Sequence, residues 1–412
     1  SLGLNVVPVG IEHGTVKVFI ADTGYEVTTF RKDIECYGRE AKVVFADTIE
    51  EDLARRDFTI NAMAYCHIKN IIIDPFNGSE DINNRIIRTV GEPLDRFRED
   101  YLRMFRALRF KSTLSSSFSV SNNTIDAIKN ISITDDWQYY VSPERIKMEF
   151  DKCLSKANKP SDMFSELLET GLLKAVLPEL EKCYGFAQNK YHASDVFWHT
   201  LYTVNSVPKE YPLIRYAALF HDLGKVVMCE NYGTEDASFK KHEVASVEIA
   251  TVIMDRLRFS NEDKSYINNL ISHHMSKFDV EMKDSGIRRF ICSIGKENVD
   301  AMLIFKRADK IGNGKKVMSE VEGYITNCKN RIEEVLSQAN AFKITDLAIN
   351  GEDVMRIKNI SPSKAVGDYL KALFDMVLEN PQLNTKEGLE RILNEMKTKK
   401  DYCCDCGQVY PS

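Results

Sequence analysis

The chain has 412 residues, of which 43% are hydrophobic and 10% aromatic; this excludes a disordered or fibrous protein and allows roughly two to four folded domains. Its formal net charge of −6 argues against general attraction to nucleic acid, but local basic patches can still bind phosphates. No apolar run reaches the length of a membrane span, and no signal peptide is recognisable. We therefore expect a cytoplasmic protein without a membrane partner, whose ten cysteines are mostly reduced.

The residue pattern changes near residue 80. Residues 4–75 are rich in Val, Ile, Thr and Phe with turn residues between them, which predicts strands and one helix. Later apolar residues recur at helical spacing, with a loop expected within residues 111–136 and breaks at 156–162 and 208–212. The predicted fold class is therefore α+β, a small mixed β-sheet followed by a long, mainly α-helical part.

Residues 51–65 begin with charged side chains and continue into an apolar, helix-like stretch. Arg55 and Arg56 can pair with phosphates through their planar guanidinium groups, and Asp57 can accept a hydrogen bond from a ribose hydroxyl. An Arg-Arg-Asp run alone is more often a solvated charge cluster. The nucleotide interpretation therefore needs support from a second segment.

Residues 96–110 provide that support. Asp100, Arg103, Arg106 and Arg109 follow one another at intervals of three, which predicts that they lie near one face of a helix. An Asp and an Arg one turn apart can read the hydrogen-bonding edge of a base, and the later arginines can hold a triphosphate. The alternative is an ordinary amphipathic helix whose arginine face is only solvated.

Together the two runs resemble the class II tRNA nucleotidyltransferases, which include the CCA-adding enzymes and their poly(A) polymerase relatives. Further segments similar to this family follow in the expected order, at residues 10–16, 25–31, 74–78, 87–91 and 142–145. Several spaced motifs are far more specific than one. The resemblance implies a catalytic head followed by a helical neck.

One part of the family pattern is missing from the chain. The family begins with a Gly-Gly-x-x-Arg-Asp turn and an Asp-x-Asp strand that hold the catalytic Mg²⁺ ions, and neither occurs here. Glu26 matches the family's third carboxylate, but one carboxylate cannot hold two metal ions. Because the nucleotide-reading residues remain, we expect a fragment whose head lacks its N-terminal part and has an incomplete Mg²⁺ site.

The middle third of the chain contains a second group of candidate ligands. His221 and Asp222 are adjacent and can offer a metal one imidazole and one carboxylate, while His199 and the distant Asp309 could complete a mononuclear site. Isolated histidines are more often structural. The order of these residues resembles the HD phosphohydrolases, which implies that all four bind a divalent metal.

Additional histidines extend this resemblance. His242, and His273 or His274, fall where binuclear members of the HD superfamily have further ligands. The resemblance implies phosphatase or cyclic phosphodiesterase activity toward RNA ends, although an HD module can also persist as a scaffold.

The C-terminal part is predicted to form a helical tail. Residues 344–353 and 366–370 resemble the family's tRNA-contacting region. Three cysteines near the chain end, Cys403, Cys404 and Cys406, could bind zinc, but a frayed and reduced tail is the favoured interpretation.

These observations favour one interpretation of the whole chain. The chain is predicted to be a CCA-adding tRNA nucleotidyltransferase that uses CTP and ATP, with tRNA as its partner and no indicated oligomeric state. Its expected domains are a truncated head, a nucleotide-selecting neck, a body with an HD metal domain, and a tRNA-binding tail, at residues 1–78, 79–155, 156–310 and 311–412.

Two other classes of function are left open. The chain could be a metal-dependent HD phosphohydrolase acting on RNA or nucleotide phosphates, with the head as a substrate-binding relic. It could also be a non-catalytic tRNA-binding protein. Within the polymerase class, addition of only CC, only A or a poly(A) tail also remains possible.

Overall fold

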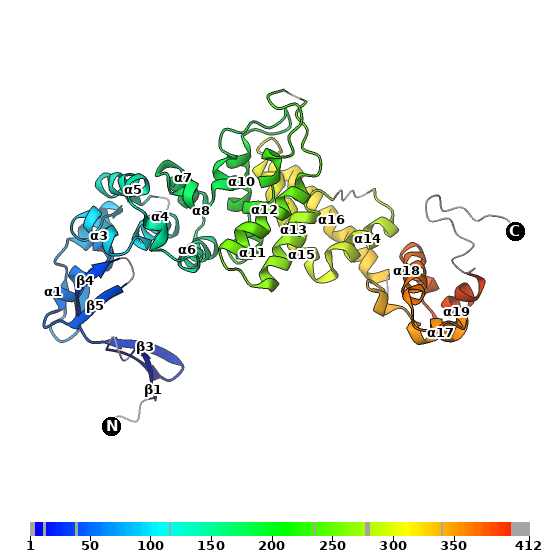
Figure 1. The fold of residues 1–412 in the computed structure, drawn as a ribbon, viewed down its shortest axis with the longest axis horizontal. Helices are drawn as coiled ribbons and strands as arrows, with labels where there is room; N and C mark the ends of the chain where they lie inside the picture. Colours follow the sequence, from blue (N-terminus) through cyan, green and yellow to red (C-terminus); the bar gives the residue numbers. More distant parts are fainter. Residues whose placement is uncertain are drawn as a thin grey trace. The chain divides into compact units, whose positions relative to one another are not determined.

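The computed structural model describes residues 5–10, 14–37, 40–114, 117–234, 236–276, 281–338 and 341–396. The chain divides into two compact units, Ser1–Ile271 with Gly312–Lys315 and Ser272–Ile311 with Lys316–Ser412 (Figure 1). The predicted domain boundaries at residues 78, 155 and 310 stay predictions. The C-terminal cysteine cluster lies outside the described residues.

Short strands form the N-terminal part of the first unit, as the sequence predicts. An antiparallel sheet contains β1 (Asn5–Gly10), β2 (Thr15–Ile20) and β3 (Thr23–Thr28) in that order. Two further antiparallel pairs follow, β4 (Arg31–Tyr37) with β5 (Glu40–Phe45) and β6 (Ala64–Cys66) with β7 (Ile71–Ile73). The last pair, β8 (Ile86–Ile87) and β9 (Ser119–Val120), is parallel.

Helices make up the rest of the first unit. Those that begin in it are α1 (Ile49–Ala54), α2 (Gly78–Asn84), α3 (Pro93–Glu99), α4 (Leu102–Leu114), α5 (Asn122–Thr134), α6 (Pro143–Lys156), α7 (Ser161–Glu169), α8 (Leu172–Val176), α9 (Pro178–Glu181), α10 (Val196–Ser206), α11 (Pro212–Phe220), α12 (His242–Arg256) and α13 (Asn261–His273). Because α6 ends at Lys156 and α11 begins at Pro212, the predicted helix breaks are confirmed.

The apolar stretch after the Arg-Arg-Asp run is not the helix that its pattern suggests. The short helix α1 precedes the run, and a single 3₁₀ turn and then β6 follow it. The backbone pairs with a distant segment instead: Thr59 N–H donates to Arg88 O at 2.9 Å, and Val90 N–H donates to Asp57 O at 3.1 Å. This tertiary pairing overrides the local periodicity and fixes Asp57 in space.

Asp100 corrects a second expectation, because it does not share a helix with the arginines that follow it. Its backbone is extended, with φ −154° and ψ 102°, and it separates α3 from α4. The Asp100 carboxylate accepts a hydrogen bond from Leu102 N–H at 3.1 Å, so it caps the first turn of α4. The competition between capping and continuing the helix therefore decides the position of Asp100.

The core of the first unit holds α4 against its neighbours. On α4, Phe105 is fully buried and lies 5.5 Å from Trp137, measured between ring centroids. Behind it, Phe150 of α6 packs on Phe164 of α7 at a similar separation of 5.5 Å. Burying aromatic side chains of this size stabilises the helices on which the candidate site is built.

Six helices belong wholly or mainly to the second unit. They are α14 (Asp284–Ile294), α15 (Val299–Gly312), α16 (Met318–Gln338), α17 (Gly351–Lys358), α18 (Lys364–Glu379) and α19 (Lys386–Glu395). Buried Val354, Leu373, Val377 and Leu389 form the core shared by the last three. The predicted helical tail is therefore confirmed.

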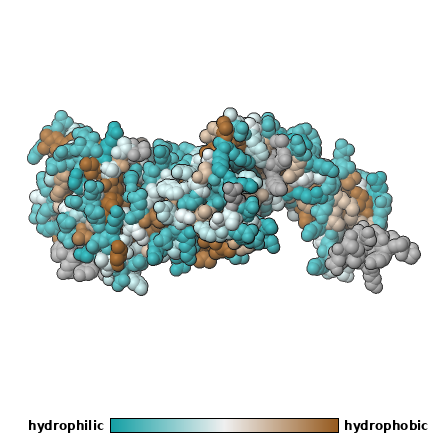
Figure 2. All heavy atoms as spheres, turned by 90° about the horizontal axis from the view of Figure 1, so that it is seen from above, coloured by the Kyte–Doolittle hydropathy of each residue, from teal (hydrophilic) through white to brown (hydrophobic). Residues whose placement is uncertain are grey.

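The face of the molecule presented in Figure 2 is mainly hydrophilic, with hydrophobic side chains in small groups among hydrophilic ones. In the described parts of the chain, no helix combines the length and the apolar character that crossing a bilayer requires.

Candidate functional site

A cavity of about 860 Å³ lies in the first unit and is lined by residues from β3, β4, α1, α4 and α6. Its volume falls in the usual range of small-molecule sites, roughly 300–1,000 Å³. Seven of the site residues predicted from the sequence line this cavity, which we call the nucleotide cavity after that prediction: Glu26, Arg55, Arg56, Asp57, Asp100, Arg103 and Arg106. The tertiary structure thus brings together segments that are far apart in the chain.

Charged groups dominate the wall of the nucleotide cavity. Six arginines and four carboxylates line it: Arg31, Arg55, Arg56, Arg103, Arg106, Arg145, Glu26, Asp52, Asp57 and Asp100. Guanidinium groups bind phosphate oxygens with two donors at once. The excess of arginines therefore suits an anionic ligand that also offers hydrogen-bonding groups.

Asp52 organises the arginine pair from α1. Its carboxylate accepts from Arg31 N–H at 3.2 Å, from Arg55 Nε at 3.1 Å and from Arg56 Nη2 at 3.2 Å. Burial raises the pKa of Asp52, but the two arginine side chains outweigh burial and hold its pKa below the ordinary value. Asp52 therefore keeps both guanidinium groups at the cavity wall.

Asp57 pairs with Arg106 across 49 residues of sequence. One carboxylate oxygen accepts from Phe58 N–H at 2.9 Å and Asn61 Nδ2 at 3.1 Å, while the other accepts from Arg106 Nε at 2.7 Å. The side chain of Asp57 is buried. This network gives the cavity one well-fixed acceptor beside one cation.

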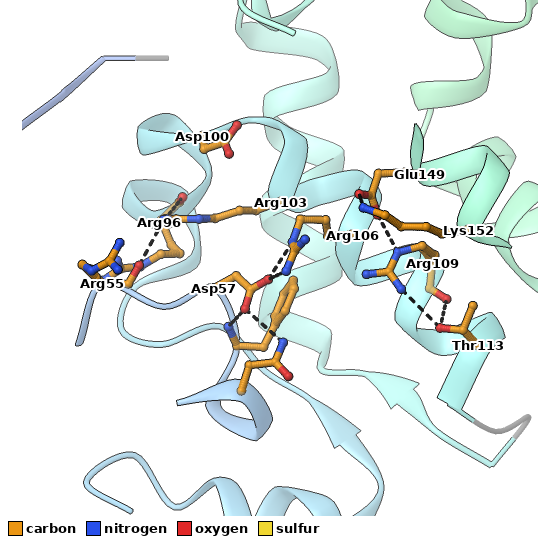
Figure 3. A network of polar contacts seen from close by, with 12 residues as sticks. Arg55, Asp57, Arg96, Asp100, Arg103, Arg106, Arg109, Thr113, Glu149 and Lys152 are labelled. Carbon is orange, nitrogen blue, oxygen red and sulfur yellow. Dashed lines mark hydrogen bonds and ion pairs between the residues drawn. The ribbon is translucent and has the colours of Figure 1, made fainter. Parts of the chain in front are cut away.

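The side chains of Asp100 and Arg103 line the cavity but do not hydrogen-bond to each other among the described residues; the two residues are joined through the backbone, where Arg103 N–H donates to Asp100 O at 3.0 Å. Arg103 Nη1 donates to Arg96 O at 2.9 Å and to the Glu99 carboxylate, and Nη2 donates to Arg55 O at 3.1 Å. Figure 3 shows Arg103 directed toward Arg96 and Arg55 rather than toward Asp100. Separate partners therefore hold the two side chains.

Arg109 lies outside the cavity lining. Its guanidinium is buried and pairs with the Glu149 carboxylate (Figure 3). The guanidinium also lies 4.0 Å from the centroid of the Phe110 ring. Lys152 Nζ also donates to Glu149, at 2.7 Å. These contacts give Arg109 a place in the packing between α4 and α6.

Sequence reasoning missed three residues of this region: Asp52, Glu99 and Arg145. Each is a charged residue inside or beside a motif already singled out, at positions 51–65, 96–110 and 142–145. Asp52 and Glu99 each pair with arginines three and four residues away, a helical spacing that could have identified both. No local spacing identifies Arg145 on α6, because its partner Asp100 is 45 residues away.

A second group of polar side chains, the HD cluster, is buried elsewhere in the first unit. It consists of His199 on α10, His221 and Asp222 at the end of α11, and His242 at the start of α12. The Nε2 atoms of His199 and His221 are 3.3 Å apart, and each lies 3.2 Å from Asp222 Oδ2. His242 Nε2 lies 3.2 Å from Asp222 Oδ1.

These distances suit ligands of one ion. Donor atoms that each lie about 2.1 Å from a metal are separated by about 3.4 Å in a tetrahedral site and by about 3.0 Å at adjacent positions of an octahedral one. His221 Nδ1 lies 2.8 Å from Ala218 O and His242 Nδ1 lies 2.7 Å from Phe239 O, contacts that leave each Nε2 lone pair for the metal. His199, His221 and Asp222 therefore fit a divalent cation as a mixed N/O donor set.

Gly224 allows the HD cluster to form. A Cβ at this position would lie 2.3 Å from His242 O and 2.7 Å from Ser246 N, and both distances are too short for any side chain. The Gly224 N–H also donates to Ser246 Oγ at 2.9 Å. The glycine thus lets the His221–Asp222 segment approach α12 closely enough to place His242 beside Asp222.

Asp222 is ionised despite its burial. Burial raises its pKa, but His221 and Lys225 outweigh that effect and hold the pKa well below the ordinary value. Lys225 Nζ lies 2.6 Å from Asp222 Oδ2 and donates to Gln188 Oε1 at 2.7 Å. Lys225, which sequence reasoning did not single out, therefore supplies a counter-charge inside the HD cluster.

Asp309, His273 and His274 belong to the second unit. Asp309 lies on α15 and is partly buried, and His273 ends α13. Their participation in the metal site stays a prediction.

Three domain families match successive parts of the chain. The Poly A polymerase head domain matches residues 3–88, and the "Probable RNA and SrmB- binding site of polymerase A" matches residues 117–184. The HD domain matches residues 197–314. Fold and site therefore define a metal-dependent nucleotidyltransferase with an RNA-binding segment and an HD domain.

The relatives most similar in sequence and fold include several CCA-adding enzymes. The CCA-adding enzyme of Bacillus velezensis is 32% identical over 391 residues, 94% of this chain and 84% of the relative. That of Anoxybacillus flavithermus is 48% identical over 176 residues, which span only 42% of each chain. The Bacillus stearothermophilus CCA-adding enzyme in complex with CTP has a similar fold, with TM-score 0.68 and 26% identity over 95% of this chain and 83% of that one.

The chain belongs to the CCA-adding enzyme family of tRNA nucleotidyltransferases. The match to this family from sequence motifs and the α+β fold class are both confirmed. The HD domain is confirmed as a domain.

Proposed function

We propose that this protein adds C and A to the 3′ end of tRNA in the cytoplasm, using CTP and ATP bound in the nucleotide cavity. The observation that carries the proposal is the convergence of the Arg-Arg-Asp run and the Asp100–Arg103 pair on one arginine-rich cavity. The family relationship supports the same activity.

The chemistry of Asp100 and Arg103 explains a choice of C and A. Cytosine and adenine both present an amino donor beside a ring-nitrogen acceptor, whereas guanine and uracil present a carbonyl beside an N–H. A carboxylate accepts from the amino group, and a guanidinium donates to the ring nitrogen. Since the two bases differ in size, the contacts of the pair have to change between the C and A steps, and Arg103 can reorient independently of Asp100 because the two side chains have separate partners.

The remaining cavity residues suit the sugar and phosphates. Arg55 and Arg56, held by Asp52, bind the triphosphate, and the Asp57–Arg106 pair lies where it can accept from a ribose hydroxyl and contact a phosphate. Arg109 is left out of this assignment because its guanidinium is committed to Glu149.

Magnesium ions would activate the 3′-hydroxyl of tRNA and stabilise the leaving pyrophosphate. Glu26 on β3 is the cavity carboxylate without an ion pair in the described residues, whereas Asp52, Asp57 and Asp100 are paired with arginines. One carboxylate does not supply the oxygen ligands that two magnesium ions need. The described residues therefore do not form a complete magnesium site by themselves.

Nucleotide binding tests the proposal without depending on turnover. We expect calorimetric titration of the chain with CTP, ATP, UTP and GTP to show binding of the first two and at least tenfold weaker binding of the others. Equal affinity for all four nucleotides, or no binding, would contradict the proposal.

The HD cluster supports a second activity, a metal-dependent phosphohydrolase acting on RNA ends. His199, His221 and Asp222 would hold a divalent cation that generates a hydroxide nucleophile and polarises a phosphate. The test is release of phosphate from an RNA 3′-phosphate after loading with Mn²⁺ or Ni²⁺. Activity that survives in Asp222→Ala would rule out this assignment.

A further inference from the structure

One contact in the nucleotide cavity is unexplained by the roles assigned so far. Arg145 Nη2 donates to Asp100 Oδ2 at 2.7 Å, and both residues line the cavity. The other carboxylate oxygen, Oδ1, accepts from Leu102 N–H at 3.1 Å. Asp100 therefore has two anchors, one on α4 and one on α6.

Two hydrogen bonds fix the orientation of the Asp100 carboxylate, whereas one would not. The torsion that turns a carboxylate about its last carbon–carbon bond has only a shallow preference, so an Asp held at one oxygen still rotates. Holding Oδ1 at the helix start and Oδ2 at Arg145 fixes the plane of the carboxylate. Each oxygen still has a second lone pair with which to accept from a base.

Arg145 is dedicated to this task among the described residues. Its guanidinium makes a single hydrogen bond, to Asp100, and its Nη1 atom is buried without an acceptor. Arg103, by contrast, is bound to two backbone carbonyls and to Glu99. No other group in the described chain competes with Asp100 for Arg145.

The fold gives Arg145 a rigid base. It lies in the first turn of α6, after Ser142 and Pro143, which are typical residues for a helix start. Ile146 and Phe150 on the same helix are buried, and α6 packs against α4. The position of Arg145 is therefore set by core packing, whereas Asp100 lies on extended backbone between two helices.

We propose that Arg145 is a positioning residue for Asp100 and thereby sets how strongly the cavity prefers CTP and ATP over UTP and GTP. The inference rests on the proposed function. Arg145 acts through the carboxylate, so its loss blurs the choice of base while the phosphate contacts from Arg55 and Arg56 remain.

The experiment measures the affinities of the full chain for the four nucleotides by calorimetry, in wild type, Arg145→Met and Arg145→Lys. We expect Arg145→Met to lower the preference for CTP and ATP about tenfold and Arg145→Lys to retain part of it, because lysine keeps the charge but not the planar fork. Arg98→Met is the matched control. Arg98 is half exposed, pairs with Asp135 and does not line the cavity.

A double-mutant cycle separates positioning from a general loss of structure. If Arg145 acts through Asp100, adding Arg145→Met to Asp100→Asn causes no further loss of preference. The inference would be overturned, with the proposed function left intact, by either of two results. One is that Arg145→Met keeps the nucleotide preference of the wild type; the other is that Arg145→Met lowers the preference equally in the wild-type chain and in the Asp100→Asn variant. Absence of any preference in the wild-type chain would contradict both.

Discussion

The nucleotide cavity and the HD cluster organise charge in opposite ways. The four residues of the HD cluster are at most 3% exposed, and their facing N and O atoms lie 3.2–3.3 Å apart. In the cavity, the Arg56 and Asp100 side chains are 47% and 26% exposed, and Asp100 and Arg103 are held by separate partners. The HD cluster is closed and buried, whereas charged side chains of the cavity stay partly exposed.

This difference fits the ligands proposed for the two regions. A metal ion is small and spherical, so a single fixed arrangement of ligands is optimal. A site proposed to accept a pyrimidine and then a purine has to change its contacts, and the separate partners of Asp100 and Arg103 allow Arg103 to move without Asp100. Both proposals can be tested.

Asp222→Ala should have the largest effect, because it removes the carboxylate on which the HD cluster converges. We expect affinity for Mn²⁺ to fall on the order of 100-fold or more, measured by calorimetry. Asp236→Ala is the control, since the Asp236 side chain is 87% exposed. Equal metal binding by both variants would mean that the HD cluster is a structural polar network rather than a metal site.

Arg109→Met should separate packing from nucleotide binding. It leaves the buried Glu149 without its closest partner, so we expect the free energy of unfolding to fall by about 3 kcal/mol with CTP affinity unchanged. Urea denaturation and calorimetry measure the two quantities. Adding Glu149→Gln should recover part of the loss. Normal stability with weakened CTP binding would instead return Arg109 to the nucleotide site.

Arg103→Ala should relax the choice of base while leaving tRNA binding intact. Removing the donor to the ring nitrogen is expected to reduce discrimination against UTP and GTP about tenfold, or about 1.4 kcal/mol. The readout is the ratio of nucleotide affinities together with tRNA affinity in a filter-binding assay. Unchanged discrimination would refute base reading by this pair.

Asp52 should give the smallest effect, and one that depends on pH. Its pKa in the folded chain lies below the unfolded value of about 3.9, so its stabilising contribution is complete above that pH and is lost as the pH falls through the folded pKa. We expect wild type to exceed Asp52→Asn in unfolding free energy by about 1 kcal/mol at pH 7, because the partner arginines are partly exposed. A difference that stays the same as the pH is lowered from 7 through the acid range would contradict an ionic origin.

Several residues of the site were predictable because their function depends on local sequence. Arg55, Arg56 and Asp57 are adjacent, and His221 is followed by Asp222, so each motif already contains the residue types that suit phosphate or metal binding. The positions of their partners were not predictable. Asp57 meets Arg106, and Asp100 meets Arg145, only because separate helices pack together.

Where local pattern misled, a tertiary contact competed with it. Spacing of three placed Asp100 and Arg109 on the face of one helix, yet Asp100 caps α4 from outside and Arg109 is turned toward buried Glu149. The apolar residues after Asp57 resemble a helix, but their backbone pairs with residues 88–90.

The amino-acid sequence alone determined the family, the α+β class and the residue types of both sites, because motifs and hydrophobic periodicity are local properties of the chain. Only the tertiary structure decided which charges meet, since an ion pair such as Arg145–Asp100 depends on how α6 packs against α4. It also decided that the side chains of the HD cluster are buried while charged side chains of the nucleotide cavity stay partly exposed. Burial and pairing are properties of packing, and packing joins residues that no sequence window contains.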